Sequence, residues 1–402
     1  MKQRTDRSAV RHGEAIHRPS QMKVAIVQEW LTTLGGSELV LRELLRIFPD
    51  ARVFTLVDKM APADRTFLGV GDTTTSFLDS IPGVAAHYRS LLPLFPLAVR
   101  SFDLRGFDVV ISNSHAVAKG ARTRSGQLHI CYCLSPMRYA WDLREQYLRE
   151  SGLASGVKGV LARALLEALR RWDLANSKDV DVFATLSHYI GDRIRRAYDR
   201  SATVIYPPVD TEFFTPLSGP GDYYITASRI VPYKRIDVIT RAFAQLPDRR
   251  LVVVGDGPDA AKVRGAAGPN VELVGRVDRE RLRDLLRGAR AFIFAAEEDF
   301  GIAPVEAQAC GIPVIAFGKG GALETVRGGD SSEPTGLFFH HQSPDAIARA
   351  VLELEALPTP ISAAACRANA EQFSEGRFRS EMRALVEREW RAFASRESPS
   401  PR

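Results

Sequence analysis

The segment EEDFGIAPVEAQACG (residues 297–311) separates two glutamates, Glu298 and Glu306, by seven residues. The apolar run AFIFAA precedes it, so Glu298 is expected in a loop that follows a strand. Pro304 suits the first turn of a helix and Gly311 suits its C-terminal cap, which places Glu306 in the opening turn. Carboxylates accept hydrogen bonds, so the pair suits neighbouring hydroxyl groups of one bound ribose or hexose. The simpler alternative is a helix-stabilising acid and a surface loop charge.

Two cations follow another expected strand. The segment SRIVPYKR (228–235) comes directly after YYITA, so Arg229 and Lys234 are expected at the carboxyl edge of a sheet. One fork-shaped and one point-like cation can clamp a diphosphate and stabilise charge on a departing nucleotide. The alternative is a pair of solvated surface charges.

Glycine-bearing loops recur after the expected strands. Gly35 and Gly36 lie between MKVAIV and the helical pattern LVLRELLRIF, where backbone N–H groups can approach an anion, or where the chain simply turns. GKGGALE (318–324) repeats this arrangement and is either a second phosphate-binding loop or a turn. VVVGDGPDA (252–260) contains G-x-G-x-x-A, but Pro258 stands where the helix should open, which favours a strand-to-loop turn over a dinucleotide site.

The composition limits the class of protein. A chain of 402 residues can form two domains that each bury a core. Its net charge of +6 favours a phosphorylated ligand or an anionic membrane surface, whereas the scattered basic residues disfavour nucleic acid. Four cysteines are too few for a disulfide framework and favour a reduced, cytoplasmic chain. No apolar run is long enough to predict a membrane span.

Alternating strand and helix patterns appear twice. ARVFTLV, FDVVISNS and LHICYC follow MKVAIV in the first half, and RLVVVG, VELVG, AFIFAA and PVIAFG follow YYITAS in the second. This alternation predicts an α/β protein with two doubly wound, Rossmann-like domains that face each other across a cleft. The predicted organisation is a disordered lead-in at 1–20, an N-terminal domain at 21–205, a Pro-rich linker at 206–220, a C-terminal domain at 221–380, a final helix at 381–395 and a disordered tail at 396–402.

Several of these segments resemble a known family when taken together. The E-x7-E segment, SRIVPYKR and LTTLGGSE resemble the retaining GT-B glycosyltransferases of the glycogen-synthase-like family, from about Met22 to the final helix. SPMRYAWD (135–142), FDVVISNSHAVAKG (107–120), VIYPPVD and AFGKGGALETV are similar to bacterial mannosyltransferases of O-antigen and exopolysaccharide assembly. The resemblance implies a GT-B fold, a final helix that crosses back to the first domain, and a nucleotide-sugar donor bound in the cleft without a metal or other cofactor.

The resemblance also implies roles for individual positions. Arg229, Lys234 and Glu298 would be catalytic, with the two cations at the diphosphate and Glu298 on the hydroxyls of the transferred sugar. It implies transfer with retention, in which the leaving diphosphate itself helps to take the acceptor's proton. The remaining donor contacts would come from Gly36 beside Gly35 at the diphosphate, from Glu306 on the ribose, from Phe300, Gly301 and Ile302 along the sugar, and from Arg276 and Val277 near the base.

One position departs from the family pattern. Relatives usually carry a histidine just before the segment that here reads SPMRY, whereas this chain has Leu134. An apolar side chain there suits a donor sugar that lacks a 6-hydroxyl group. His115, which follows the strand candidate FDVVISNS, is either a cleft residue on the sugar side or a packed, capping histidine.

Two segments bear on the acceptor. AHYRSLLPLFPLAVRSFDL (86–104) and SGVKGVLARALLEALRRWDL (155–174) combine apolar stripes with arginines, as core-facing helices do and as helices resting on anionic lipid do. The resemblance implies a polyprenyl-diphosphate-linked glycan acceptor. It therefore predicts peripheral association with the cytoplasmic face of the membrane, with Arg138, Tyr139 and Trp141 on the acceptor side.

The leading hypothesis is a hexosyltransferase that moves mannose from GDP-mannose onto a lipid-linked or growing polysaccharide in cell-surface glycan biosynthesis. The alternatives are a UDP-sugar or 6-deoxyhexose donor, an inactive nucleotide-sugar-binding subunit, and an NAD-dependent oxidoreductase that uses the GDGPDA loop.

Overall fold

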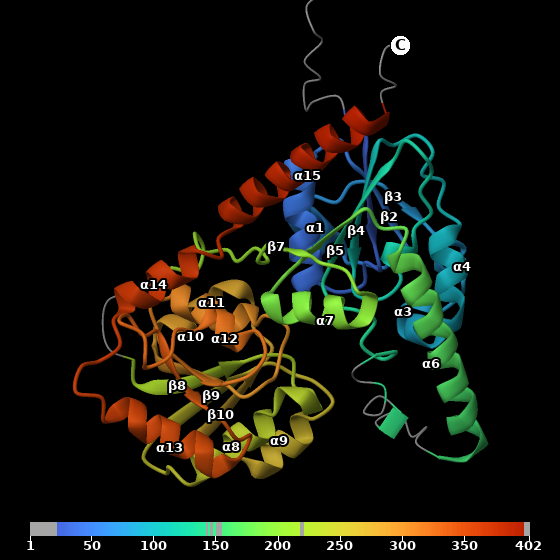
Figure 1. Ribbon diagram of the computed structural model, residues 1–402. Coiled ribbons are helices and arrows are strands. Elements are labelled where there is room, and N and C mark those ends of the chain that lie inside the picture. Colours follow the sequence, from blue (N-terminus) through green and yellow to red (C-terminus); the bar gives the residue numbers. More distant parts are fainter. Residues whose placement is uncertain (1–21, 142–143, 145–147, 150–154, 218–220, 398–402) are drawn as a thin grey trace, which may run out of the picture.

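The described part of the chain folds into two lobes (Figure 1). The expected lead-in at 1–20 lies outside it. The computed structural model describes residues 22–141, 144, 148–149, 155–217 and 221–397.

The N-terminal lobe is built on a seven-stranded parallel sheet with the order β3-β2-β1-β4-β5-β6-β7. Its elements are β1 Val24–Gln28, α1 Gly36–Ile47, β2 Arg52–Thr55, α2 Pro62–Leu68, β3 Thr73–Thr75, η2 Phe77–Ser80, α3 Val84–His87, η3 Tyr88–Leu94, α4 Phe95–Arg100, β4 Val109–Ser114, η4 Ala118–Gly120, β5 Leu128–Cys133, α6 Gly156–Ser177, β6 Val182–Thr185, α7 His188–Tyr198 and β7 Thr203–Val204.

The C-terminal lobe is built on a six-stranded parallel sheet with the order β10-β9-β8-β11-β12-β13. Its elements are β8 Tyr223–Ala227, η5 Pro232–Lys234, α8 Ile236–Ala244, β9 Arg250–Val254, α9 Ala260–Ala266, β10 Val271–Gly275, α10 Arg279–Arg287, β11 Ala289–Phe294, α11 Ile302–Ala309, β12 Val314–Phe317, α12 Ala322–Thr325, β13 Gly336–Phe339, α13 Pro344–Glu355, α14 Ala363–Glu371 and α15 Glu375–Glu397.

The central strands are buried along their whole length because helices cover both faces of each sheet. Every residue of β1, β4 and β5 is buried, as continuous apolar runs predict for parallel strands. Ile26 of β1 lies opposite Val53 of β2 and Ile111 of β4, which sets the register at the middle of the sheet. The predicted α/β architecture with two doubly wound sheets is confirmed.

Four strands were not anticipated from the sequence. Strand β3 forms one edge of the first sheet, β6 and β7 lie at its opposite edge, and β13 is an edge strand of the second sheet. Each has four residues or fewer. Such short segments contain too few residues for a periodic pattern to appear, and a neighbouring strand determines their conformation.

The strand order reverses once in each sheet. The chain runs outward from β1 to β3 and then returns to place β4 on the other side of β1, and it does the same around β8 and β11. Adjacent loops diverge at such a point and leave a crevice at the carboxyl ends of the strands, where doubly wound folds bind their ligands. The loops after β1, β4, β8 and β11 contain Gly35, His115, Arg229 and Glu298 respectively.

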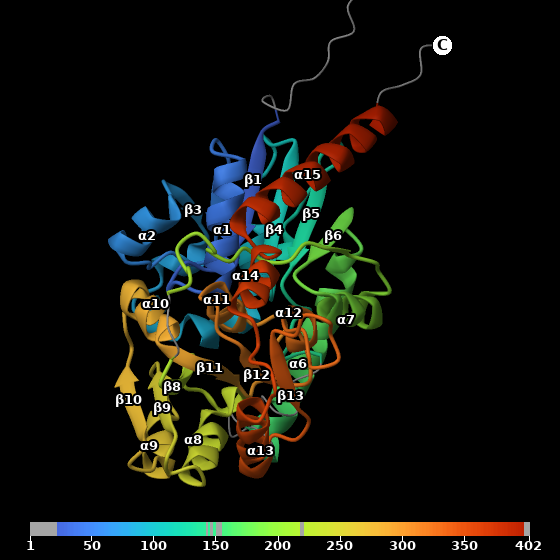
Figure 2. The ribbon, with the colours of Figure 1, turned by 90° about the vertical axis from the view of Figure 1, so that its left-hand side faces the viewer.

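The last helix, α15, leaves the C-terminal lobe and packs on the N-terminal lobe beside α1 and β5 (Figures 1 and 2). Phe378 is fully buried there and meets the ring of Tyr132 edge-on, with ring centroids 5.7 Å apart. The helix begins at Glu375 rather than at the predicted residue 381. Residues 396 and 397 continue it, so the predicted tail is wrong at those two positions, and residues 398–402 lie outside the described part.

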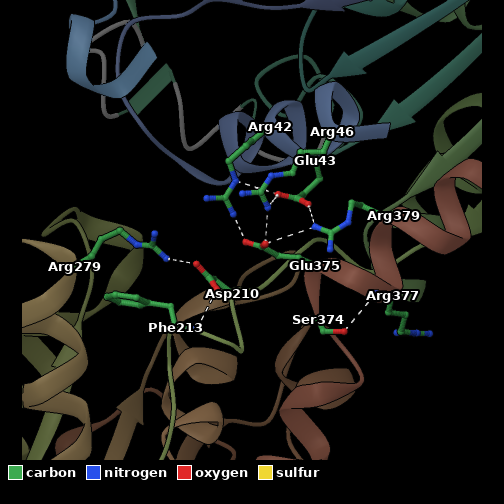
Figure 3. A network of polar contacts seen from close by, with 10 residues as sticks. All are labelled: Arg42, Glu43, Arg46, Asp210, Phe213, Arg279, Ser374, Glu375, Arg377 and Arg379. Atoms are coloured by element: carbon green, nitrogen blue, oxygen red, sulfur yellow. Dashed lines mark hydrogen bonds and ion pairs between the residues drawn. The ribbon is translucent and has the colours of Figure 1, made fainter. Parts of the chain in front are cut away.

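The two chain crossings between the lobes lie side by side. Val209 of the first crossing pairs with Ser374 of the second in a short parallel bridge, and the Val209 N–H donates to the Phe373 carbonyl at 2.9 Å. The next residue, Glu375, turns its carboxylate toward α1 (Figure 3).

An ion network joins this crossing to α1. Arg42 and Arg46 of α1 both bond Glu375, with Arg46 Nη1 2.8 Å from Glu375 Oε2. Glu43 is fully buried and accepts from Arg42, Arg46 and, across the junction, Arg379 (Figure 3). Removing one partner of a buried ion pair leaves an uncompensated charge, so this network holds α1 and the start of α15 in a defined relation.

We expect Phe378→Ala to destabilise the N-terminal lobe by about 3–5 kcal/mol, because it deletes a fully buried aromatic ring that joins α15 to β5. Urea unfolding followed by tryptophan fluorescence measures the change, since every tryptophan lies in that lobe or in α15. Arg391→Ala, at an exposed position of α15, is the matched control and should change stability by less than about 0.5 kcal/mol. Equal effects of the two substitutions would contradict the docking of α15 on this lobe.

Candidate active site

A large cavity lies where the carboxyl edges of the two sheets face each other. Its volume is about 990 Å³, which is large enough for a nucleotide sugar with part of an acceptor. Both lobes contribute to its walls. Thirteen of the positions predicted from the sequence line it, namely Gly35, Gly36, His115, Leu134, Arg138, Tyr139, Arg229, Lys234, Glu298, Phe300, Gly301, Ile302 and Glu306.

Two helix N-termini point into the cavity from opposite lobes. Helix α1 begins at Gly36 after Gly35, and α11 begins at Ile302 after Gly301, and neither has a side-chain cap. A Cβ atom at Gly36 would lie 3.1 Å from Cδ1 of Ile302, so the two helix ends nearly touch. Uncapped N–H groups and the positive ends of both helix dipoles therefore face the same space, which favours an anionic ligand.

The predicted cations and the first predicted glutamate come together beside these helix ends. Lys234 forms an ion pair with Glu298, with both side chains at least four-fifths buried. The exposed guanidinium of Arg229 has no hydrogen-bond or ion-pair partner within the described ranges. Arg229 is thus a cavity cation that remains available for a phosphate, while Lys234 positions the carboxylate of Glu298.

The other glycine loops support this arrangement from behind. Gly255 and Gly257 press against the backbone of Ser228 and Ile230, where a Cβ atom would collide with carbonyl oxygens. The GDGPDA segment is therefore a turn that supports the Arg229 loop, as the sequence favours.

The GKGG loop (318–321) supports the loop that contains Glu298 in the same way. A side chain at Gly320 would collide with the Glu298 carbonyl, and one at Gly321 with the backbone of Phe300. The Gly321 N–H donates to the Glu298 carbonyl at 2.8 Å. The loop does not line the cavity in the described part of the chain, so of the two interpretations the structure favours the turn.

Glu306 lies on the cavity wall without a hydrogen-bond partner for its carboxylate among the described residues. Because α11 begins at Ile302, Glu306 is the fifth residue of the helix and lies beyond the opening turn in which the sequence placed it. Gly311 follows the helix end with φ +81°, as expected of a C-terminal cap. Burial raises the pKa of Glu306 to about 7, against the opposing effect of the Arg279 cation.

His115 is held by a carboxylate that the sequence analysis did not single out. Glu29 is fully buried and accepts four successive backbone N–H groups, from His115 to Ala118, at 2.7–3.2 Å. The ring of His115 meets Trp30 edge-on at 4.7 Å. Burial lowers the pKa of His115, so the imidazole facing the cavity is neutral near neutral pH. The sequence signal that could have revealed this role is the position of Glu29 itself, a charged residue directly after the buried strand β1.

Three predicted positions do not line the cavity. The indole Nε1 of Trp141 donates to Oδ2 of Asp173 at 2.8 Å, and the guanidinium of Arg170 lies over its ring. Val277 packs against the hydrophobic core, and Arg276 beside it is exposed. In the same segment Arg279, not predicted, reaches the cavity instead, because α10 begins there and directs its side chain inward.

Arg279 belongs to a cluster at one end of the cavity. Its Nη2 donates to Oδ2 of Asp210 at 2.8 Å, and its guanidinium lies over the rings of Phe213 and Phe67 (Figure 3 shows the first two contacts). Phe67 comes from the N-terminal lobe, so this cluster also spans the cleft. No local motif predicts such a grouping, since its members come from three distant segments.

The fold and the cavity define a class. Two facing Rossmann-like domains, with a terminal helix that returns to the first, constitute the GT-B fold of glycosyltransferases. Sucrose-phosphate synthase from Thermosynechococcus elongatus has a TM-score of 0.69 to this chain at 20% identity, covering 92% of this chain and all of that one. Anabaena HepE, solved in complex with UDP and glucose, has a TM-score of 0.67 at 17% identity, covering 91% of this chain and all of HepE.

Sequence comparison adds a family match in the second lobe. Residues 210–373 match the family model described as "Glycosyl transferases group 1". A curated relative is the GDP-mannose-dependent monoacylated alpha-(1-6)-phosphatidylinositol monomannoside mannosyltransferase of Corynebacterium glutamicum, 32% identical over 53% of this chain and 59% of its own length. The D-inositol 3-phosphate glycosyltransferase of Mycolicibacterium gilvum is 37% identical over 38% of each chain. The matches thus cover less than two-thirds of these relatives.

We expect Glu306→Gln to stabilise the protein at pH 8 by about 1–3 kcal/mol while leaving it nearly unchanged at pH 5. A carboxyl group whose pKa rises from 4.5 to about 7 on folding destabilises the folded state progressively between those pH values, and the neutral amide removes this cost. Urea unfolding of both proteins at a series of pH values measures the effect. A stability difference that does not vary with pH would show that Glu306 is not desolvated.

Proposed function

We propose that this protein is a retaining glycosyltransferase that moves a hexose from a nucleotide-diphosphate sugar onto an acceptor held against the N-terminal lobe. The observation that carries the proposal is the convergence of two uncapped helix N-termini and the unpaired Arg229 guanidinium on one cavity that also contains Glu298 and Glu306. Cationic and N–H groups suit the diphosphate, and the carboxylates suit hydroxyl groups.

In the proposed reaction the acceptor hydroxyl oxygen forms a bond to C1 of the sugar as the bond from C1 to the diphosphate oxygen breaks. The acceptor's proton passes to an oxygen of the leaving diphosphate. Arg229, Lys234 and the backbone N–H groups at Gly36 stabilise the negative charge that develops there. Glu298, held by Lys234, orients the sugar through its hydroxyls, and Glu306 orients the nucleotide through its ribose.

We infer that the donor is GDP-mannose and that the product belongs to cell-surface glycan biosynthesis. The names of the Corynebacterium and Mycolicibacterium smegmatis relatives support a GDP-mannose donor, at 32% and 33% identity. Leu134, which lines the cavity, supports the alternative of a 6-deoxyhexose. Incubation with GDP-mannose and with a GDP-6-deoxyhexose distinguishes the two, because a clear preference for GDP-mannose removes the alternative.

We expect Arg229→Ala to weaken GDP binding about 10- to 100-fold, because a charge-assisted bond to a phosphate contributes about 1.5–3 kcal/mol. Isothermal titration with GDP and UDP measures both affinity and base preference. Arg250→Ala removes a half-exposed arginine outside the cavity and should leave GDP binding unchanged.

Other outcomes of the same titration are informative. Tighter binding of UDP than of GDP would overturn the donor assignment, and no binding of either would overturn the proposed function. GDP release from GDP-mannose separates an active transferase from an inactive binding subunit.

We propose that the acceptor is lipid-linked, such as a polyprenyl-diphosphate-linked glycan, and that the N-terminal lobe rests on anionic lipid. Helices α4 and α6 are joined near their C-terminal ends by a hydrogen bond from Arg100 to Asn176. Val157, Leu161 and Leu97 are 64–78% exposed. No helix in the described ranges has the length and apolar character needed to cross a bilayer. Exposed apolar side chains near the start of α6, next to the exposed Lys158, match an interfacial contact with acidic headgroups.

We expect the double substitution Val157→Ser, Leu161→Ser to reduce binding to phosphatidylglycerol-containing vesicles at least about tenfold, since two apolar side chains leave the interface. Flotation with these vesicles and with pure phosphatidylcholine vesicles measures binding. Leu352→Ser, at a half-exposed leucine of α13 in the other lobe, is the control. Equal flotation of native and variant chains, or binding of neither, would contradict this surface.

A further inference from the structure

Asp299 joins the two lobes at the mouth of the candidate site. It follows Glu298 directly in the loop after β11, and its side chain is 11% exposed. Its Oδ1 accepts from Arg193 Nη1 at 3.1 Å, and its Oδ2 accepts from Arg138. Both arginines belong to the N-terminal lobe, so one carboxylate of the second lobe binds two cations of the first.

The two arginines are not equivalent. Arg193, on α7, is 6% exposed, whereas Arg138 is 41% exposed and lines the cavity. Arg138 can therefore rotate toward a ligand while Asp299 keeps a buried partner in Arg193. Loss of the exposed ion pair with Arg138 costs far less free energy than loss of both ion pairs, because the buried carboxylate of Asp299 still has Arg193 as its partner.

The contact around α7 remains when Arg138 leaves. Ser187 Oγ donates to the Asp299 carbonyl at 2.6 Å. The backbone N–H groups of His188 and Tyr189, at the start of α7, donate to the Glu324 carboxylate of the second lobe, each at 2.8 Å. Release of Arg138 thus leaves the lobes joined.

The N-terminal wall of the cavity contains a second arginine, Arg89, in addition to Arg138. Burial is the main cause of the lowered pKa of His115, and the charges of Arg138, Lys119 and Arg89 lower it further, against the effect of Glu29. Arg89 lines the cavity beside Arg138 and forms no ion pair in the described part of the chain. Two arginines on one wall, remote from the proposed diphosphate cation Arg229 in sequence and in lobe, form a second place for an anionic group.

We propose that Arg138 binds a phosphate group of the acceptor and that Asp299 occupies Arg138 until this group arrives. The incoming phosphate replaces Asp299 as the ion-pair partner of the Arg138 guanidinium. Asp299 stays paired with Arg193. The inference rests on the proposed function, because that function assigns the N-terminal wall of the cavity to the acceptor. Its test measures binding and requires no catalytic turnover. The bidentate geometry of arginine suits either a phosphodiester of a lipid headgroup or a soluble sugar phosphate.

The test measures phosphate binding by isothermal titration with GDP present in excess, so that the donor position is filled. Short-chain dihexanoyl phosphatidylglycerol and glycerol 3-phosphate are the two probes, and the tighter one identifies the lipid or the soluble source. We expect Asp299→Asn to tighten binding about tenfold, because it removes the competing carboxylate, and Arg138→Gln to abolish binding in the otherwise native chain. Glu333→Gln breaks a surface pair with Arg327 in the same lobe and should change nothing.

The double variant Asp299→Asn, Arg138→Gln separates the two arginines. It should bind neither probe. If the double variant still bound a probe more tightly than the native chain does, Arg193 would be the residue that binds the phosphate, and this result would overturn the proposal. Unchanged binding in Arg138→Gln would also overturn it, and that variant gives an answer even if Asp299→Asn fails to fold. Retained GDP binding in each variant shows that the donor site is intact, so failure of this inference is distinguishable from failure of the proposed function.

Discussion

One pair of carboxylates fixes the chain crossing between the two sheets to the N-terminal lobe. Glu43 in α1 and Glu375 at the start of α15 together bind three arginines, Arg42, Arg46 and Arg379, at the place where the chain re-enters the N-terminal lobe. Because α1 is a rigid helix, clamping its second half to this junction also determines where its first residue lies. The junction thus brings two helix N-termini, one from each lobe, to within contact of each other.

The cavity illustrates how a doubly wound sheet positions chemistry. Arg229 and Glu298 each follow a strand beside a reversal of strand order, and both of their loops are supported from behind by glycines that approach the backbone closely. Gly255 and Gly257 support the Arg229 loop, and Gly320 and Gly321 support the Glu298 loop. Loops of this kind hold side chains nearly as firmly as strands do, which reduces the reorganisation needed when charge develops on a ligand.

The electrostatics of the cavity combine satisfied and unsatisfied groups. Lys234 with Glu298 and Arg279 with Asp210 are paired, whereas Arg229 and Glu306 have no partner in the described part of the chain. Glu306 shows what this arrangement costs, since burial raises its pKa to about 7 and ionisation opposes folding. Functional sites often retain such locally unfavourable groups at a cost in stability.

Local sequence determined the repeating strand–loop–helix units, the two-domain α/β fold, and the placement of Arg229, Lys234 and Glu298 at strand ends, because these features depend on apolar periodicity and short-range turn chemistry. It did not reveal the roles of Asp299 and Arg279, whose partners lie far away in the sequence or in another lobe. It signalled Glu29 only through its position after β1, because the backbone groups that Glu29 binds, such as that of Ala116, lie in a distant segment. Trp141, Arg276 and Val277, which it placed in the site, lie outside the cavity lining, since a residue near a motif can point into the core or the solvent depending on where its helix begins. Which groups face one another was decided by the docking of two sheets through α15, a long-range packing that no local pattern encodes.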